Sequence, residues 1–100
     1  MTDRQASIER KTKETNIEVT LNLDGGNSSI ETGIPFFTHM LEQLAKHSGM
    51  GLLVKSIGDL EVDAHHTVED VGISIGEAFN NSLGEKLGIR RFSSVSVPLD

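Results

Sequence analysis

The sequence contains no cysteine, and this absence excludes disulfide bonds, zinc–thiolate sites and thiol catalysis. It also has no long hydrophobic run, so no segment is predicted to span a membrane. The amino-terminal residues 1–11 are polar and do not resemble a signal peptide. These absences together predict a soluble, cytoplasmic protein with no membrane partner.

Basic residues are scarce as well, with nine Lys and Arg against 15 Asp and Glu and a formal net charge of −6. Phosphate neutralisation requires clustered Lys and Arg, so the sequence predicts no nucleic-acid partner. The chain has room for one domain, residues 1–100, because compact domains usually contain about 100–150 residues. A chain this short buries only about 60–70% of its unfolded surface, and association between copies would add to its stability.

Hydrophobic periodicity predicts the strands. Apolar and polar residues alternate over residues 6–12 and 16–23, as is typical of half-buried strands. The DGGN sequence at 24–27 predicts a turn, because Gly and Asn adopt positive φ at little cost. Further strands are predicted at 28–31, 52–57, 60–63 and 92–97.

Apolar residues spaced three and four apart predict two helices. The first covers residues 36–47, with Pro35 near its first turn. The second covers residues 66–83, and its internal Gly72 and Gly76 are predicted to pack closely against a sheet. The element order predicts an α+β fold, a two-layer sandwich of a roughly four-stranded sheet with two helices on one face.

The sequence HHTVED at 65–70 concentrates the residues that carry chemistry. Neighbouring helical residues point about 100° apart, so His65 and His66 are predicted to serve two different metal ions. His66 and Glu69 are three residues apart and are predicted to share one ion. Asp63 and Asp70 are candidates to accept a hydrogen bond from the second nitrogen of an imidazole. Imidazole and carboxylate ligands suit manganese, iron or zinc.

Each of these histidines also has a simpler explanation. Histidines at the start of a helix are often exposed or act only as hydrogen-bond partners. His39, on the first predicted helix, fits the polar edge of an amphipathic helix. His47 lies near the end of that helix, where a cation interacts favourably with the helix dipole, or where the side chain would line a pocket.

Charged residues near the two ends of the chain offer further candidates. Arg91, with Arg90 and Lys86, is predicted to hold an anion such as a phosphate ester, or else to interact with a helix end. Glu14 lies in the charged segment 10–15, which fits an edge strand protected by lysine. The same Glu14 would act as an acid or base if it faced the metal ions.

Several motifs occur in order along the chain: RKTKET at 10–15, TGIPFFTHML at 32–41, HHTVEDVG at 65–72 and GIRRF at 88–92. Together they resemble the imidazoleglycerol-phosphate dehydratase family of histidine biosynthesis, from about residue 4 to residue 100. The resemblance implies the first of two similar α+β halves and large symmetric homo-oligomers. It also implies sites of two manganese ions, or other divalent ions, where subunits meet.

The resemblance implies a role for each candidate residue in a hydro-lyase reaction. That reaction is the metal-dependent dehydration of imidazole glycerol phosphate, a small phosphate ester, to imidazole acetol phosphate. The implied roles are metal binding by His39, His65, His66 and Glu69, proton transfer and substrate contact by Glu14, substrate contact by Gln43 and His47, and phosphate binding by Arg91.

The chain departs from the family pattern in two ways. It contains no second HH-x-x-E segment of the kind that the family's second half carries, and Thr38 stands where many relatives have aspartate. An alternative function is therefore a truncated or stand-alone half-domain that binds metal and self-associates without catalysis. A third is an anion-binding structural domain without metal. We expect copies of the chain to associate, so that one half stands in for the missing one.

Overall fold

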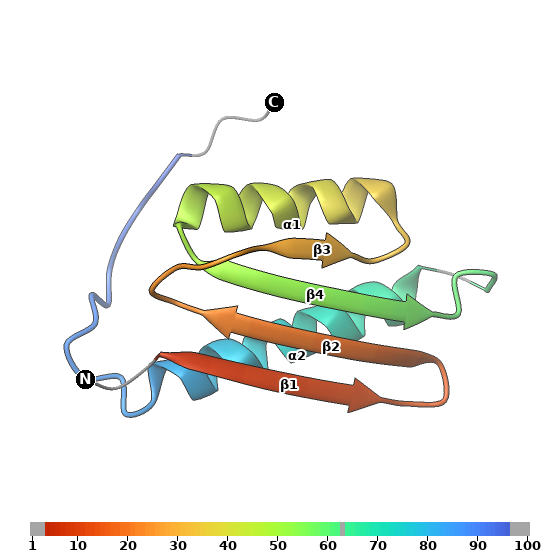
Figure 1. The fold of residues 1–100 in the computed structure, drawn as a ribbon, viewed down its shortest axis with the longest axis horizontal. Helices are drawn as coiled ribbons and strands as arrows, with labels where there is room; N and C mark the ends of the chain where they lie inside the picture. Colours follow the sequence, from red (N-terminus) through yellow and green to blue (C-terminus); the bar gives the residue numbers. More distant parts are fainter. Residues whose placement is uncertain (1–3, 63, 97–100) are drawn as a thin grey trace.

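The computed structural model describes residues 4–62 and 64–96. Within them the chain forms four strands and two helices (Figure 1). In chain order these are β1 (Gln5–Lys11), β2 (Thr15–Asn22), β3 (Ser29–Glu31), α1 (Pro35–Ser48), β4 (Gly51–Gly58) and α2 (His65–Leu83).

The strands form one mixed sheet in the order β1-β2-β4-β3. β1 pairs with β2 and β2 pairs with β4, both antiparallel, whereas β3 pairs with β4 in parallel. The parallel pair follows from α1, which carries the chain from the end of β3 back to the start of β4. Residues 5–22 therefore make a hairpin, residues 29–58 add a β-α-β unit beside it, and α2 follows.

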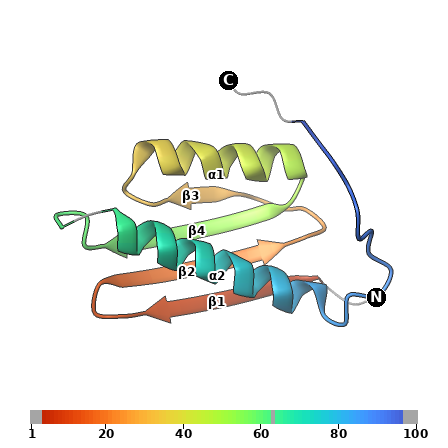
Figure 2. The ribbon, with the colours of Figure 1, turned by 180° about the vertical axis from the view of Figure 1, so that it is seen from behind.

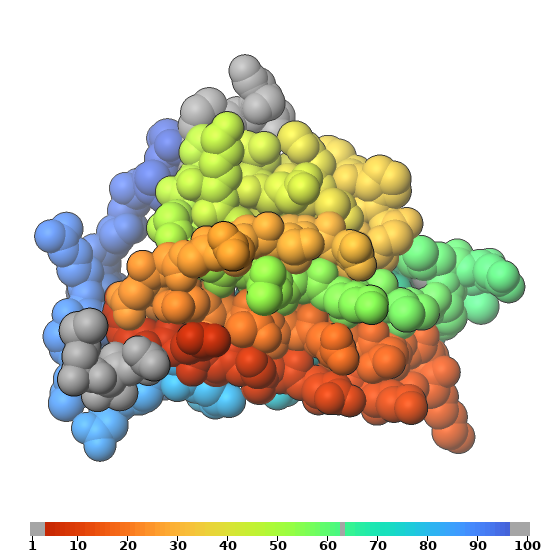
Figure 3. Space-filling view, in the orientation of Figure 1, coloured from red at the N-terminus to blue at the C-terminus, as the bar shows by residue number. Residues whose placement is uncertain are grey.

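One face of the sheet is apolar and both helices cover it. Ile17, Val19 and Leu21 alternate along β2 and are buried, while the residues between them are more exposed. α2 lies across this face with Val71 and Ala78 in the same hydrophobic cluster (Figure 2). α1 closes the cluster beside β3, and its buried residues are Leu41 and Ala45. The opposite face has no helix over it, and α2 is almost hidden in that view (Figure 3). The predicted two-layer α+β fold is confirmed.

The predicted reason for the two glycines of α2 is wrong. Gly72 and Gly76 are exposed, and a Cβ atom added at either would meet nothing within 4 Å. Small residues do line the face of α2 that packs on the sheet, but they are Thr67, Ser74 and Ala78. The two glycines lie about 100° or more around the helix from that face.

Two of the predicted strands are also wrong. Residues 60–62 form a turn in which the Val62 N–H donates to the Asp59 carbonyl at 2.9 Å, and Asp63 lies outside the described residues. Residues 92–96 have no regular structure, and Phe92 is 95% exposed. Val97, the last residue of that predicted strand, lies outside the described residues. Alternation produces a strand only where a neighbouring strand is available to pair with it, and none of the described strands pairs with residues 92–96.

Among residues 4–62 and 64–96, neither helix combines the length and the apolar character needed to cross a bilayer.

Candidate metal and substrate site

Two connections between elements and the starts of both helices lie at one end of the sheet. The β1–β2 turn, the β4–α2 connection and the first turns of α1 and α2 all lie there (Figures 1 and 2). The side chain of Leu60 lies so close to Gly33 that a Cβ on Gly33 would be 2.7 Å from Leu60 Cδ1. We call residues 12–15, 58–62 and 64–70 the histidine end.

Gly58 explains why α2 begins against the sheet. It is the last residue of β4, and a Cβ atom added to it would overlap the buried Thr67 hydroxyl in the first turn of α2. The lack of a side chain at Gly58 lets strand and helix approach each other closely. His65 and His66 are thereby held at the edge of the sheet.

The β1–β2 turn is closed by the side chain of Thr12. Its Oγ1 accepts hydrogen bonds from the backbone N–H groups of Glu14 and Thr15, at 3.1 and 3.0 Å. The Thr12 N–H donates to the Thr15 carbonyl at 2.9 Å. Ser and Thr hydroxyls stabilise turns in this way. The turn presents Glu14 as an exposed side chain at its tip.

Asp70 joins this turn to α2. Its Oδ2 accepts a hydrogen bond from Thr15 Oγ1 at 2.5 Å, and its Oδ1 accepts one from Arg10 Nε at 3.2 Å. The bond from Thr15 lowers the pKa of Asp70, Arg10 and the nearby His66 contribute in the same direction, and burial opposes them. The prediction that Asp70 accepts from an imidazole is therefore wrong, because its oxygens bind the two strands instead.

His66 is hydrogen-bonded to a residue that the sequence patterns did not single out. Its Nδ1 lies 2.8 Å from Oδ2 of Asp59, the residue that directly follows β4. This hydrogen bond raises the pKa of His66, burial opposes it, and the negative charges of Asp59, Glu14 and Asp70 add smaller increases. Glu14 and His66 are therefore close enough to interact. Asp63, the other predicted acceptor, lies outside the described residues.

His65 is the partner of Glu69. Nε2 of His65 lies 2.8 Å from Oε2 of Glu69, four residues later on α2. The spacing of three predicts that Glu69 and His66 share one metal ion, and this stays a prediction. The direct contact of Glu69 in the structure is with His65, because positions three and four apart are both neighbours on a helix. The two imidazole rings lie edge to face, with centroids 5.6 Å apart.

The donor types at this end suit a divalent metal ion, but the donors are arranged in pairs. Imidazole and carboxylate ligands without thiolate favour manganese, iron or zinc. Within the described part of the chain, no three His, Asp or Glu side chains converge on one position. His39 is exposed on the second turn of α1, the helix whose first turn lies at the same end of the sheet. Among the described residues the structure thus brings together two imidazole–carboxylate pairs, His65 with Glu69 and His66 with Asp59, and it does not join His39 to them in one set.

Three predicted substrate contacts lie elsewhere. Gln43 and His47 face each other on α1, with Gln43 Oε1 3.2 Å from His47 Nε2, and both line a groove of ≈ 430 Å³. Arg91 Nη2 donates to the Lys86 carbonyl at 2.9 Å, beyond the end of α2. We call residues 84–91 the arginine end. The 19 residues of α2 span roughly 28 Å, so Arg91 and His66 cannot contact one small substrate within a single copy.

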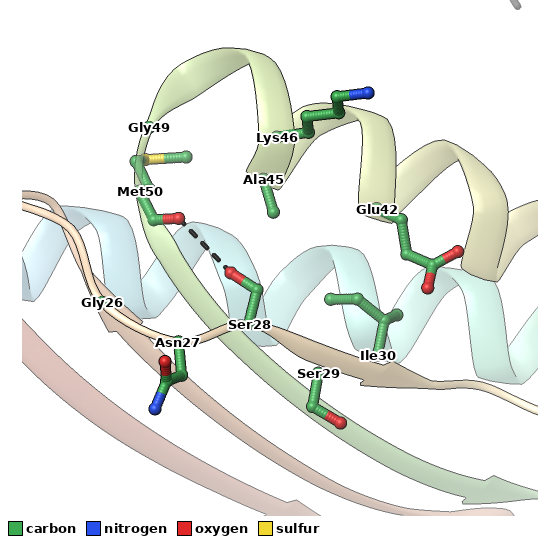
Figure 4. Close-up of a pocket in the computed structure, with 10 residues that line it drawn as sticks. All are labelled: Gly26, Asn27, Ser28, Ser29, Ile30, Glu42, Ala45, Lys46, Gly49 and Met50. Carbon is green, nitrogen blue, oxygen red and sulfur yellow. Dashed lines mark hydrogen bonds between the residues drawn. The ribbon is translucent and has the colours of Figure 1, made fainter.

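A further groove of ≈ 480 Å³ lies between β3 and the second half of α1 (Figure 4). It is lined by small residues such as Ser28 and Ala45, with Glu42 and Lys46 at its side, and Ser28 donates to the Met50 carbonyl at 3.4 Å. None of the predicted site residues lines it.

These features define a two-layer α+β domain that presents imidazole–carboxylate pairs at one end of its sheet. The sequence of residues 32–100 matches the family model of imidazoleglycerol-phosphate dehydratase. The chain belongs to this family, and the resemblance predicted from its motifs is confirmed.

Relatives and a solved structure agree with this assignment. The chain is 57% identical to the imidazoleglycerol-phosphate dehydratase of Parafrankia sp., over 97% of this chain and 50% of that protein. It is 56% identical to that of Acidothermus cellulolyticus, over 97% of this chain and 48% of that protein. The crystal structure of the Staphylococcus aureus enzyme matches with a TM-score of 0.78 and 29% identity, over 96% of this chain and 52% of that one. The chain thus spans about half the length of these relatives.

Proposed function

We propose that this chain contributes to the metal-dependent dehydration of imidazole glycerol phosphate to imidazole acetol phosphate in histidine biosynthesis. The family to which the chain belongs supports this reaction class. The observation that supports it most is geometric: the β1–β2 turn that exposes Glu14 is bonded through Thr15 to Asp70, on the helix that begins with His65 and His66. A proton-transfer group and a metal ligand are expected side by side in such a site.

We propose that the metal is manganese, in sites that hold two ions. His39, His65, His66 and Glu69 would supply the ligands from this chain. Bound ions would stabilise the negative charge that develops on the substrate when a carbon-bound proton of low acidity is removed. Glu14 would accept or return a proton at its carboxylate, because the Thr12 turn holds it exposed at the histidine end.

The proposed partners are the phosphate ester and other copies of this chain. Arg91 would bind the phosphate, yet it lies at the opposite end of α2 from His66. A complete site would therefore combine Arg91 of one copy with the histidine end of another. Apolar side chains that remain partly exposed on both helices support association, and they include Met40, Leu44, Val68 and Phe79.

The reaction is tested with a dehydration assay on the purified chain, with manganese and with a chelator. Turnover that requires manganese is expected. Glu14→Gln should lower turnover by about 10²–10⁴-fold with manganese content unchanged, because general acid–base groups contribute that much. Glu18→Gln, an exposed glutamate on β2, is the matched control. Unimpaired turnover of Glu14→Gln would remove Glu14 from the mechanism.

The second candidate is a half-domain that binds metal and self-associates without catalysis. It is favoured by the lack of a three-ligand cluster in the described residues. Sedimentation at micromolar concentration, with manganese and after chelation, distinguishes the two candidates when combined with the assay. Association without turnover supports the half-domain, and a chain that stays monomeric in excess manganese contradicts the proposed partner.

A further inference from the structure

Asp59 is the carboxylate that holds the His66 ring. The 2.8 Å contact joins Asp59 Oδ2 to His66 Nδ1, and the two side chains are 23% and 42% exposed. A carboxylate offers only acceptor oxygens, so the ring nitrogen must be the donor. A neutral imidazole carries one N–H, and with that proton on Nδ1 the lone pair of the ring lies on Nε2.

The turn after β4 fixes the position of Asp59, and His66 is the partner of its carboxylate. The backbone carbonyl of Asp59 accepts from the Val62 N–H and closes the turn after β4, which fixes the position of the residue. The second carboxylate oxygen, Oδ1, is buried and has no hydrogen-bond partner among the described residues. Among the described residues, His66 is therefore the hydrogen-bond partner of this carboxylate.

We propose that Asp59 is a positioning residue that selects the Nδ1–H form of His66 and directs Nε2 toward a divalent metal ion. This inference rests on the proposed function for the ion itself. Metal-binding histidines commonly donate their other ring N–H to a carboxylate, which sets both the tautomer and the ring orientation. His65, by contrast, meets its carboxylate Glu69 through Nε2, so the adjacent imidazoles are oriented through different ring nitrogens.

The first test needs no metal. Imidazole nitrogen NMR of the metal-free chain, above the pH at which His66 titrates, should show the Nδ1–H tautomer in the wild type. Asp59→Ala should shift His66 toward the Nε2–H tautomer. The matched control is Asp24→Ala, which removes an exposed aspartate that is paired with Arg4 at the other end of the sheet. A His66 tautomer that does not change in Asp59→Ala overturns the proposal.

The second test measures manganese affinity from the electron paramagnetic resonance signal of unbound Mn²⁺. Asp59→Ala should weaken binding about 10–100-fold, the usual effect of losing such a partner, and Asp24→Ala should not. Asp59→Asn keeps the side-chain shape and one acceptor oxygen, so an intermediate loss in a folded protein is expected. Wild-type affinity in both Asp59 variants overturns the proposal. A wild-type chain that binds no manganese contradicts the proposed function instead, and the NMR result then decides separately whether Asp59 orients the ring.

Discussion

At the histidine end, one buried carboxylate ties three elements together, whereas at the arginine end the polar contacts are exposed or local. Asp70, whose side chain is 10% exposed, binds Thr15 and Arg10, which lie 55 and 60 residues away in the sequence. Within residues 4–62 and 64–96, the hydrogen bond of Arg91 is to the carbonyl of Lys86, five residues away, and this contact is exposed to solvent. Arg4 precedes β1 and Asp24 follows β2, and the start of β1 and the end of β2 lie at the same end of the sheet as the end of α2 (Figure 1). The side chains of the Arg4–Asp24 ion pair are 46% and 57% exposed.

The difference indicates where the chain holds fixed geometry. Hydrogen bonds to a buried charge keep most of their strength, while exposed ion pairs are weakened by water and salt. The residues proposed to bind metal and move protons therefore lie where the elements are cross-linked. Arg91, proposed to bind phosphate, lies on a segment whose side-chain contact in the described structure is local and exposed.

The largest effect is expected from Gly58→Ala. The added methyl group would overlap the Thr67 hydroxyl and push the first turn of α2 away from β4. We expect the free energy of unfolding to fall by about 3 kcal/mol, the upper part of the range for overpacking a core. Urea unfolding followed by circular dichroism measures it. A loss below about 1 kcal/mol would mean that the contact of strand and helix does not fix the histidine end.

Asp70→Asn should lower the free energy of unfolding by about 2 kcal/mol at neutral pH, because the charged acceptor for Arg10 and Thr15 is lost. The pKa of Asp70 is lowered in the folded state, so its contribution is present above the ordinary value of 3.8 and is lost as pH falls through the folded-state pKa. Wild type and variant should therefore converge in acid. Chemical unfolding at a series of pH values tests this, with Asp24→Asn as the exposed control. A difference that persists at low pH would contradict the assignment.

Gly76→Ala should stabilise the chain by about 0.5–1 kcal/mol, because alanine is the better helix former and the added Cβ meets nothing within 4 Å. Gly72→Ala should act in the same direction for the same reason. Thermal unfolding of both variants at low protein concentration provides the measurement. Destabilisation would show that another surface packs on the exposed side of α2 in solution. The histidine end and the arginine end would then differ partly because of that contact.

The smallest effect on stability is expected from Arg91→Ala, within about 0.5 kcal/mol, as for other exposed positions. If the proposed function holds, the same variant should weaken phosphate-ester binding while manganese affinity stays unchanged. Calorimetric titration with the phosphate ester, with Lys46→Ala as an exposed basic control, separates the two readouts. A stability loss as large as that of Asp70→Asn would mean that the arginine end is held more firmly than its contacts indicate.

Periodicity predicted the helices and the four strands of the sheet to within a residue or two, because each buries one face against the same core. It was wrong for residues 60–62 and 92–96, where the pattern was present but a pairing strand was not. It was also wrong about Gly72 and Gly76, since spacing alone does not say which face of a helix meets the sheet.

The candidate site was only partly predictable for a related reason. Sequence spacing limits which residues share a helix face, but it does not say which of two neighbouring residues a side chain will contact. Glu69 contacts His65 rather than His66 in the structure. The partner of His66 comes from the connection before α2, and only the packing of Gly58 on Thr67 brings Asp59 within reach. The sequence contains one indication of the contact between Asp59 and His66, which is an aspartate directly after a glycine that ends a buried strand. Whether the candidate residues bind metal or substrate remains a prediction.

The long sequence separation of the Asp70 contacts has a consequence for the order in which the chain folds. The hairpin of β1 and β2 needs only residues 5–22 and can form while the rest of the chain is still being synthesised. Its turn acquires the Asp70 bonds only after α2 has left the ribosome, since 55 and 60 residues separate the partners. We therefore expect the surroundings of Glu14 to reach their final geometry only after α2 has formed, although Glu14 is synthesised well before Asp70.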